Sequence, residues 1–292
     1  MHLKIRAAVY AVLAAALYAV NVPFSKRLLM QVSPTMMAAF LYLGAGIGLF
    51  FVRLFSGKQE NEAPLTKKEL PYTVGMIVLD LAAPILLMLG VARTDAANAS
   101  LLNNFEIVAT ALIAFAVFRE KISRLVGISI LLVTAASILL GFEGAGSLSF
   151  NVGSLFVLGA AACWGLENNC TRMLSGKSPS QITTVKGICS GLGSLILALT
   201  VGEPLPPLTA MLPVLLLGFV AYGLSIYFYI FAQRDLGAAK TAAFYSIAPF
   251  LGVFFSMALL GETPGVQFYL GFAVMAAAAV LLIRDTLSGE AP

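Results

Sequence analysis

The chain has 292 residues, of which 60% are hydrophobic and only 11% are charged. About a quarter of the residues in a soluble domain are charged, so this chain has too few charges to cover a water-facing surface and is expected to lie in lipid. The formal net charge of +4 does not indicate nucleic-acid binding, because the basic residues are scattered between long apolar runs and form no patch.

The residue inventory also limits the chemistry that the chain can support. The one histidine, His2, lies at the N-terminus, which excludes histidine-based catalysis and histidine-ligated metal from the membrane interior. Cys163, Cys170 and Cys189 lie in apolar segments and are expected to be free thiols. The chain contains no phosphate-binding GxxxxGKS or GxxxxGKT motif. We therefore expect no enzyme, no cofactor and no ATP-driven motor.

Ten apolar segments are long enough, or nearly long enough, to cross a bilayer, for which a helix needs about 20 residues. They span residues 7–29, 34–54, 71–91, 96–118, 124–141, 151–173, 180–201, 208–232, 239–260 and 265–284. These segments predict an all-α integral membrane protein with ten transmembrane helices.

The distribution of lysine and arginine predicts the orientation of these helices. Ten spans place both termini on one side, and that side carries thirteen basic residues: Lys4, Arg6, Arg53, Lys58, Lys67, Lys68, Arg119, Lys121, Arg124, Arg172, Lys177, Arg234 and Arg284. The opposite connections carry three, Lys26, Arg27 and Arg93. Both termini are therefore predicted to be cytoplasmic, in a multi-pass protein of the cell (inner) membrane.

The two halves of the chain, residues 1–144 and 145–292, are similar to one another and contain five predicted spans each. Tyr18 aligns with Trp164. Because five is odd, the second half enters the membrane from the opposite side, which gives an inverted repeat. The first apolar segment follows basic residues, as in a signal peptide, but its counterpart in the second half indicates a helix that is retained.

Two segments carry a family resemblance: NASLLNNFEIVATALIAFAVFREKIS at 98–123, and a weaker copy, TAAFYSIAPFLGVFFSMALLGETP, at 241–264. The matching pattern is a small-residue helix, an acidic-proline step, and a Gly-Glu or Arg-Glu end. Its positions are matched by Glu106, Glu120, Pro249 and Glu262. Over nearly its whole length the chain resembles the EamA-type members of the drug/metabolite transporter superfamily.

Each copy departs from the family pattern at one residue, since Ile107 replaces the proline and Ala248 replaces the glutamate. The resemblance implies ten helices arranged around a central cavity that opens alternately to each side of the membrane. It also implies that helices 1, 3, 4, 6, 8 and 9 line this cavity. It says almost nothing about the substrate.

Ionisable residues near the middle of a span are costly, and they are candidates for function. Asp80 and Glu106 lie 14 residues before and 12 residues after a predicted turn near Thr94. Both therefore lie roughly 20 Å into the bilayer. Two carboxylates at one depth can share a proton or bind a cation. Alternatively, each acid is neutral and hydrogen-bonds Asn103 or Asn104, which holds the helices together.

Glu167 and Lys186 form a second predicted level, because they lie 10 residues before and 9 residues after a turn near Lys177. Each is about 14 Å from that turn, so the two can pair. The favoured interpretation is a structural clip, and the alternative is that Lys186 binds a substrate carboxylate. If the pair forms, Glu167→Ala is expected to lower the folded yield more than removal of both residues.

Aromatic side chains can line a cavity for apolar or cationic groups. The candidates are Tyr18, Trp164, Tyr222, Tyr227, Phe228, Tyr229, Phe244 and Tyr245. Tyr18 and Trp164 are the strongest because the repeat aligns them, and Tyr222 and Tyr245 are added as site candidates. Tyr227 and Tyr229 lie on different faces of one helix, so both cannot point inward. Packing against lipid is the alternative for these rings.

Other polar and small residues have mainly structural interpretations. Asn21 with Pro23 can mark an unwound stretch, as can the pair at 168–169, and Asn21 is kept as a site candidate. The steps from Gly44 to Gly48 and from Gly187 to Gly191 predict close helix packing. Lys240, near a helix end, is expected to extend toward the membrane surface.

The leading functional hypothesis is a secondary active exporter of a small metabolite or amino-acid-like solute, cationic or zwitterionic, with proton coupling left open. The alternatives are a proton-independent facilitator of the same fold and a receptor or scaffold that transports nothing. The expected partners are a small-molecule substrate, the lipid bilayer and, if transport is coupled, protons. The protein is expected to act as a monomer and to bind no nucleic acid.

Overall fold

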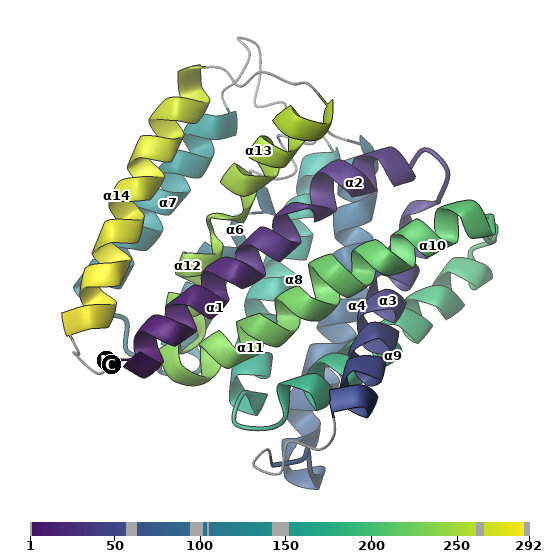
Figure 1. The fold of residues 1–292 in the computed structure, drawn as a ribbon, viewed down its shortest axis with the longest axis horizontal. Coiled ribbons are helices and arrows are strands. Elements are labelled where there is room, and N and C mark those ends of the chain that lie inside the picture. The colour runs from purple at the N-terminus through teal and green to yellow at the C-terminus, as the bar shows by residue number, and fades with distance from the viewer. Residues whose placement is uncertain are drawn as a thin grey trace.

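The computed structural model describes residues 2–56, 63–93, 102–103, 105–141, 152–260 and 266–288, and the regular structure within these ranges is helical (Figure 1). The first half contains α1 (His2–Ala19), α2 (Asn21–Leu28), α3 (Pro34–Ser56), η1 (Lys67–Glu69), α4 (Leu70–Arg93), α6 (Phe105–Ala116) and α7 (Arg124–Gly141). The second half contains α8 (Val152–Leu174), α9 (Pro179–Thr200), α10 (Leu208–Leu217), η2 (Gly218–Leu224), α11 (Ser225–Leu236), α12 (Ala238–Tyr245), α13 (Ala248–Leu260) and α14 (Val266–Ser288).

Each of the ten predicted segments contains helix in its described part. Three of them are composite: α1 with α2, α10 with η2 and α11, and α12 with α13. Six helical stretches of the described chain are long and apolar enough to cross a membrane: Leu3–Leu28, Pro34–Phe55, Lys67–Arg93, Pro179–Thr200, Leu208–Leu236 and Tyr269–Thr286. The protein is therefore a multi-pass membrane protein, and the regular structure of its described residues is helical.

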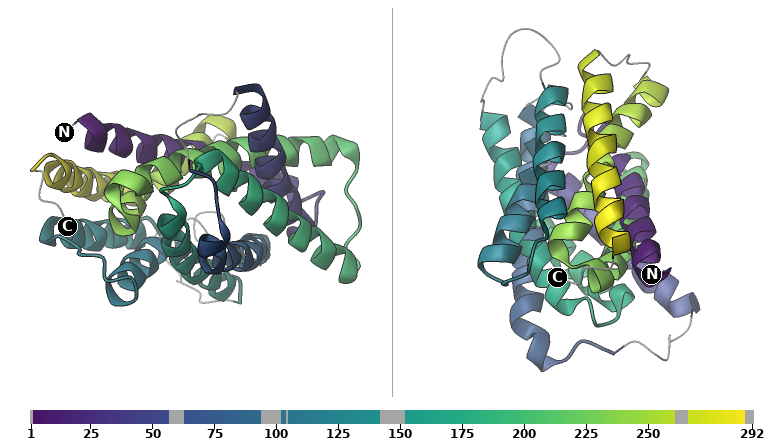
Figure 2. Two further views of the ribbon diagram at one scale, coloured as in Figure 1. Left: turned by 90° about the horizontal axis from the view of Figure 1, so that it is seen from below. Right: turned by 90° about the vertical axis from the view of Figure 1, so that its left-hand side faces the viewer.

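The helices pair across the two halves of the chain. Helix α3 packs along α9, α4 along α8, α1 along α11, and α7 along α14. The start of α1 and the end of α14 lie at the same end of the molecule (Figures 1 and 2). Segments that are distant in sequence thus form one helical body, and each of these four pairings joins a helix of the first half to a helix of the second.

Polar contacts tie the helix ends together at the end that holds both termini. Lys177 Nζ lies 3.3 Å from Glu69 Oε1. The Glu120 carboxylate accepts hydrogen bonds from the backbone N–H groups of Ala238 and Ala239, at 3.1 and 3.2 Å, where α12 begins. Anionic side chains stabilise helix N-termini in this way. The loops predicted to share the termini's side are therefore neighbours in the structure.

The same end contains a buried ion pair between α12 and α14. Lys240 pairs with Asp285, whose carboxylate is 1% exposed and also accepts a hydrogen bond from Ser123 Oγ at 2.5 Å. Lys240 is therefore held by a carboxylate near the end of α14, and its predicted extension toward the membrane surface stays a prediction. Asp285, near the end of α14, is a buried partner that the sequence analysis did not identify.

A second set of contacts closes the opposite end. The Glu203 carboxylate, just after α9, accepts hydrogen bonds at 2.7 Å from both Ser33 Oγ and the Met36 N–H at the start of α3. Lys26 Nζ donates to the Val91 carbonyl oxygen at 3.0 Å. The connections that the lysine and arginine distribution assigns to opposite sides of the membrane thus lie at opposite ends of the helical body.

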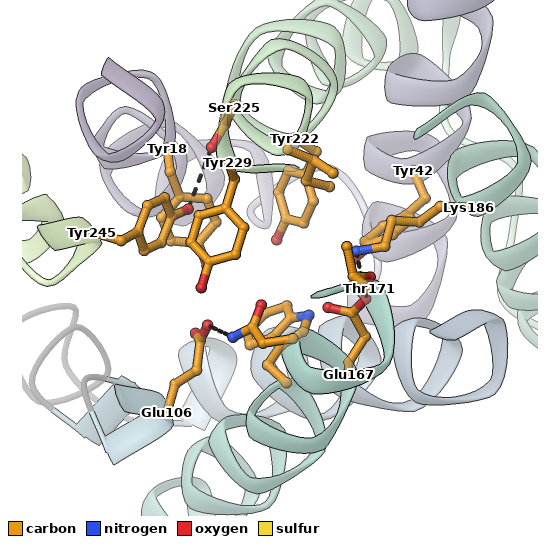
Figure 3. A pocket seen from close by; sticks show the side chains of 14 residues that line it. Tyr18, Tyr42, Glu106, Glu167, Thr171, Lys186, Tyr222, Ser225, Tyr229 and Tyr245 are labelled. Carbon is orange, nitrogen blue, oxygen red and sulfur yellow. Dashed lines mark hydrogen bonds and ion pairs between the residues drawn. The ribbon is translucent and has the colours of Figure 1, made fainter. Parts of the chain in front are cut away.

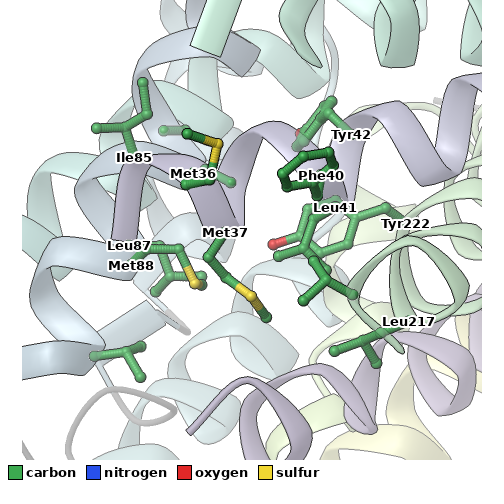
Figure 4. Close-up of a cluster of buried hydrophobic side chains, with 14 of the residues drawn as sticks. Met36, Met37, Phe40, Leu41, Tyr42, Ile85, Leu87, Met88, Leu217 and Tyr222 are labelled. Carbon is green, nitrogen blue, oxygen red and sulfur yellow. The ribbon is translucent and has the colours of Figure 1, made fainter. Parts of the chain in front are cut away.

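The largest apolar core lies where α3 meets α4 and the helices from α10 to η2 (Figure 4). Its fully buried side chains include Met36, Met37 and Leu41 from α3 and Met88 from α4. Methionine is flexible enough to fill irregular gaps between helices. This core holds α3 against the helices that carry the polar cavity described below.

Glycines permit the close crossing of α3 and α9, as the sequence predicts. A Cβ atom at Gly187 would lie 2.4 Å from the backbone nitrogen of Gly46, and one at Gly46 would lie 2.5 Å from the backbone nitrogen of Ile188. Gly44 and Gly218 are similarly tight, since each Cβ would lie 2.1 Å from a backbone carbonyl oxygen of the facing helix. These obstacles are backbone atoms, which a change of rotamer cannot move.

Replacing Gly187 with leucine is therefore expected to remove most of the folded protein. The added side chain must separate α3 from α9, and overpacking a fitted contact already costs about 1–3 kcal/mol without such a backbone clash. Size-exclusion chromatography of the detergent-extracted protein measures the folded yield. Gly127→Leu is the matched control, because a Cβ atom there meets nothing within 4 Å. Equal yields for the two variants would contradict the tight crossing.

Candidate functional site

A partly open cavity, whose empty space of about 490 Å³ includes solvent at its mouth, lies between the two halves of the chain (Figure 3). Its walls come from α1, α3, α6, α8, α9, η2, α11 and α12. The lining residues are Tyr18, Tyr42, Glu106, Trp164, Glu167, Asn168, Thr171, Lys186, Ala221, Tyr222, Ser225, Ile226, Tyr229 and Tyr245. Five of the nine tyrosines and the one tryptophan of the chain thus surround a single space.

The tyrosine rings contact one another and form a continuous aromatic wall. The ring centroid of Tyr18 is 5.7 Å from that of Tyr222 and 5.6 Å from that of Tyr245. Tyr229 meets Tyr245 at 5.0 Å, and Tyr42 meets Tyr222 at 5.1 Å, both nearly edge to face. Rings in this arrangement stabilise one another and present rigid, electron-rich surfaces.

Two helix irregularities place Tyr222 in this wall. The α-helical hydrogen bonding between α10 and α11 is replaced at η2 by a π-helical segment, and Tyr222 belongs to this segment. Short π-helical segments are frequent at functional sites. On the other side, helix α1 ends at Ala19 and α2 begins at Asn21, whose Nδ2 donates to Tyr222 Oη at 3.3 Å. Val20, between the two helices, keeps helical backbone angles, so the stretch from Asn21 to Pro23 is helical and not unwound as predicted. The Asn21 side chain positions Tyr222 from behind the cavity.

Three charged side chains meet at one end of the cavity. Lys186 Nζ lies 3.0 Å from Asp80 Oδ2 and 2.9 Å from Glu167 Oε1. Tyr42 Oη donates to Asp80 Oδ1 at 2.7 Å, and Thr171 Oγ1 donates to Glu167. We call Lys186, Asp80 and Glu167 the charged triad. Its members are 3%, 0% and 2% exposed. The positive charge of the ammonium group is therefore balanced by the two carboxylates and not by water.

The triad confirms one predicted pair and corrects another. Glu167 and Lys186 are in contact, as their depths predict. Asp80 does not pair with Glu106, because its carboxylate faces Lys186 and Tyr42, and it does not line the cavity. The four ionisable residues predicted at two depths therefore form one triad, and Glu106 lies apart from it.

Glu106 lies at the other end of the cavity, beside Tyr18, Tyr229 and Tyr245 (Figure 3). Its Oε1 accepts a hydrogen bond at 2.7 Å from Asn168 Nδ2. Asn168 lies within the continuous helix α8, so the unwound stretch predicted at 168–169 is absent from this described helix. Tyr229 is 6% exposed, and its Oη has no hydrogen-bond partner among the described residues.

The arrangement can bind a positive charge and an apolar body together. Glu106 supplies a carboxylate at the edge of a largely buried aromatic wall, and rings and carboxylates both attract cations. Asn168 is fixed by further hydrogen bonds, since its Nδ2 also donates to Thr110 Oγ1 at 3.1 Å and its backbone carbonyl oxygen accepts from Gln233 Nε2 at 2.9 Å. The partner of Glu106 is therefore preorganised rather than free to turn away.

Comparison with known proteins shows the family of this chain. The model of the EamA-like transporter family matches residues 5–142 and again residues 151–284. The chain belongs to the EamA-like transporter family. The described helices of this EamA-like protein therefore belong to a membrane transporter fold, and the cavity is the place to look for its substrate site.

Individual relatives agree with this assignment. An uncharacterized transporter of Methanothermobacter thermautotrophicus is 26% identical over 84% of this chain and 76% of its own length. The uncharacterized transporter YyaM of Bacillus subtilis is 23% identical over 88% of this chain and 85% of its own length. A protein crystal structure that is 15% identical superposes with a TM-score of 0.81 over 98% of both chains, which shows the fold alone.

The predicted site residues of this EamA-like protein divide into two groups. Those that line the cavity are Tyr18, Glu106, Trp164, Glu167, Lys186, Tyr222 and Tyr245. The others are Asp80 and Asn21, which support lining residues, and Asn103, which is half-buried and outside the lining. The family resemblance implied helix 3 as lining, but α4 contributes no lining residue, whereas α3 and α9 do.

The sequence analysis missed Tyr42, Asn168, Thr171 and Ser225 as lining residues, and it left open which of Tyr227 and Tyr229 points inward. Helical spacing carried a signal for some of them, because residues 222, 225, 226 and 229 share one helix face and all four line the cavity. That face selects Tyr229 and turns Tyr227 toward Phe231, with ring centroids 5.0 Å apart. The prediction that only one of the two tyrosines points inward is consistent with this arrangement.

Proposed function

We propose that this EamA-like protein is a secondary active transporter that moves a small organic solute by alternating access through the aromatic cavity. The observation that carries the proposal is a half-enclosed cavity in a transporter fold, with an acid, Glu106, among tyrosine rings. The cargo carries a positive charge, as a cation or a zwitterion. We propose export as the direction, no enzymatic activity, no cofactor and no nucleic-acid partner, and action as a monomer.

Alternating access is supported by the symmetry of the helix contacts. We propose ten spans in two inverted repeats, residues 1–144 and 145–292. The proposed repeat relates each span to the one five places later. Under this exchange, the contact of α1 with α11 corresponds to that of α8 with α4, and the contact of α1 with α13 corresponds to that of α8 with α6. All four contacts exist. The pairs α3 with α9 and α7 with α14 map onto themselves. Two such halves can rock about the cavity between them.

Glu106 is the proposed site of proton coupling. It is the lining acid that no lysine or arginine neutralises among the described residues, whereas Glu167 is held by Lys186. An acid that binds either a proton or a cation exchanges one for the other across the membrane. A proton-independent facilitator uses the same cavity, and a receptor or scaffold uses it for binding alone.

Reconstitution into liposomes separates these functions. A ligand-stabilisation screen first identifies a solute that binds. Accumulation of that solute is then measured with and without an imposed pH gradient. We expect accumulation against its concentration gradient only with the pH gradient. Equilibration that ignores the pH gradient would favour the facilitator, and binding without any flux would favour the receptor.

The orientation of the chain is proposed from its charges, with both termini cytoplasmic in the cell (inner) membrane. In a variant without native cysteines, Gly176→Cys is expected to be labelled only from the cytoplasm and Leu205→Cys only from the outside. Gly176 is exposed with nothing within 4 Å of a Cβ atom, and Leu205 is 65% exposed, so both positions accept a reporter. The label is a membrane-impermeant maleimide. If it reached both positions from the same side, an even number of spans would separate them, which would contradict the one span predicted between residues 176 and 205.

A further inference from the structure

The charge of Lys186 is already neutralised within the protein. Both carboxylates of the triad lie within 3.0 Å of its Nζ. Lysine contributes one positive charge and the two acids two negative ones, so the ionised triad has a formal charge of −1. A substrate carboxylate that approached Lys186 would meet the carboxylates of Asp80 and Glu167 at nearly the same distance. The repulsion between these like charges opposes its binding.

The opposite end of the cavity has the complementary character. Glu106 has one hydrogen-bond donor, Asn168, and three tyrosines stand beside it (Figure 3). The hydroxyl of Tyr229 is buried, lines the cavity and has no partner in the described part of the chain. Buried polar groups normally have hydrogen-bond partners, so this hydroxyl points to a polar ligand group. An ammonium group can donate to both Glu106 and Tyr229 Oη while it lies against the rings.

We propose that the cavity selects organic amines that lack a carboxylate, and that Asp80 and Glu167 set this selectivity by keeping Lys186 from binding anions. The ammonium group of the ligand lies at Glu106, and its apolar body lies against the tyrosines and Trp164. The inference rests on the proposed function only in taking the cavity as the substrate site. It narrows the cargo from cations and zwitterions to cations.

Trp164 provides a reporter for the test, because it is the only tryptophan of the chain and lines the cavity. Its fluorescence, excited at the red edge where phenyl groups do not absorb, is titrated in purified protein with phenethylamine, phenylalanine and 3-phenylpropionate. These probes share the phenylalkyl body and differ in charge. We expect phenethylamine to bind at least about tenfold more tightly than phenylalanine, and 3-phenylpropionate not to bind. Tenfold corresponds to about 1.4 kcal/mol, within the cost of one unfavourable charge contact.

Two further pairs of an amine and its parent amino acid, isoamylamine with leucine and cadaverine with lysine, control for the shape of the apolar body. The proposal is overturned if the amino acid of any bound pair binds as tightly as its amine. It is also overturned if no amine in the three pairs changes the fluorescence at millimolar concentration.

Variants of the triad then test the cause of the selectivity. Asp80→Asn with Glu167→Gln leaves the Lys186 charge uncompensated, and we expect phenylalanine to gain at least about tenfold relative to phenethylamine. Glu167→Gln alone retains a neutral pair of Lys186 with Asp80, so it keeps the test available if the double variant folds poorly, and part of the same shift is expected. Glu69→Gln is the control, since Glu69 lies at a helix start outside the cavity lining. An unchanged ratio in the triad variants would overturn the assigned cause.

These measurements report binding and not flux. Amine binding without transport in liposomes would leave the selectivity intact and refute the proposed transport. Transport of an amino acid in preference to its amine would support the proposed transport and refute the selectivity.

Discussion

Replacement of Glu106 by glutamine is expected to abolish accumulation against a gradient while the folded yield stays near that of the wild type. Glutamine has the same volume, and its Oε1 can accept the hydrogen bond that the carboxylate accepts from Asn168 at 2.7 Å. It can neither exchange a proton nor neutralise a cation. We expect the rate of uphill transport of a bound amine to fall by at least about 100-fold, which corresponds to roughly 2.7 kcal/mol. The measurement is accumulation in proteoliposomes under a pH gradient.

Counterflow, in which labelled solute exchanges for unlabelled solute without a gradient, identifies the role that is lost. It survives if Glu106 only couples the proton and disappears if Glu106 also holds the substrate. Glu69→Gln is the control for the same change of charge outside the cavity lining. Uphill transport at the wild-type rate in Glu106→Gln would contradict both roles and would leave the acid as a structural hydrogen-bond acceptor.

The sequence predicted the helical segments because long apolar runs can hardly be anything else in a chain with so few charges. It predicted the contact of Glu167 with Lys186 because the two residues share a depth and carry opposite charges. Depth alone was not sufficient for Asp80 and Glu106. Counting residues from a turn gives the height of a side chain in the membrane but not the direction in which its helix turns it.

The aromatic cavity could be predicted only in part. Alignment of the two halves indicated Tyr18 and Trp164, and helical spacing was consistent with an inward Tyr229. Tyr42 gave no signal of its own, because it enters the cavity through the close crossing of α3 and α9 that Gly46 and Gly187 permit. The π-helical segment around Tyr222 was also invisible, since no simple sequence pattern distinguishes such a segment from an ordinary helix.

Replacement of Lys186 by methionine is expected to remove nearly all folded protein. Methionine retains much of the volume but leaves Asp80 and Glu167 buried without a cation. Removal of one member of a buried ion pair costs about 3–5 kcal/mol, and here two carboxylates lose their partner. A typical folded protein is stable by only about 5–15 kcal/mol. Folded yield and thermal midpoint, measured by size exclusion after heating, report the loss.

Neutralising the two acids as well should restore folding. In the triple variant with Lys186→Met, Asp80→Asn and Glu167→Gln, no charge is stranded, and the amides can still accept hydrogen bonds from Tyr42 and Thr171. We expect its folded yield to exceed that of Lys186→Met several-fold. A yield as low as that of the single variant would show that Lys186 supports the fold by packing and not by its charge.

The triad also reverses an expectation drawn from the pair alone. A simple pair of Glu167 with Lys186 would make the loss of both residues milder than Glu167→Ala. With Asp80 on the same ammonium group at 3.0 Å, Glu167→Ala leaves a neutral pair, whereas Glu167→Ala with Lys186→Ala leaves Asp80 buried and unneutralised. We therefore expect the double variant to give less folded protein than the single one, by both yield and thermal midpoint. A double variant that folds better than Glu167→Ala would contradict the contact between Asp80 and Lys186, because only an isolated pair is relieved by losing both partners.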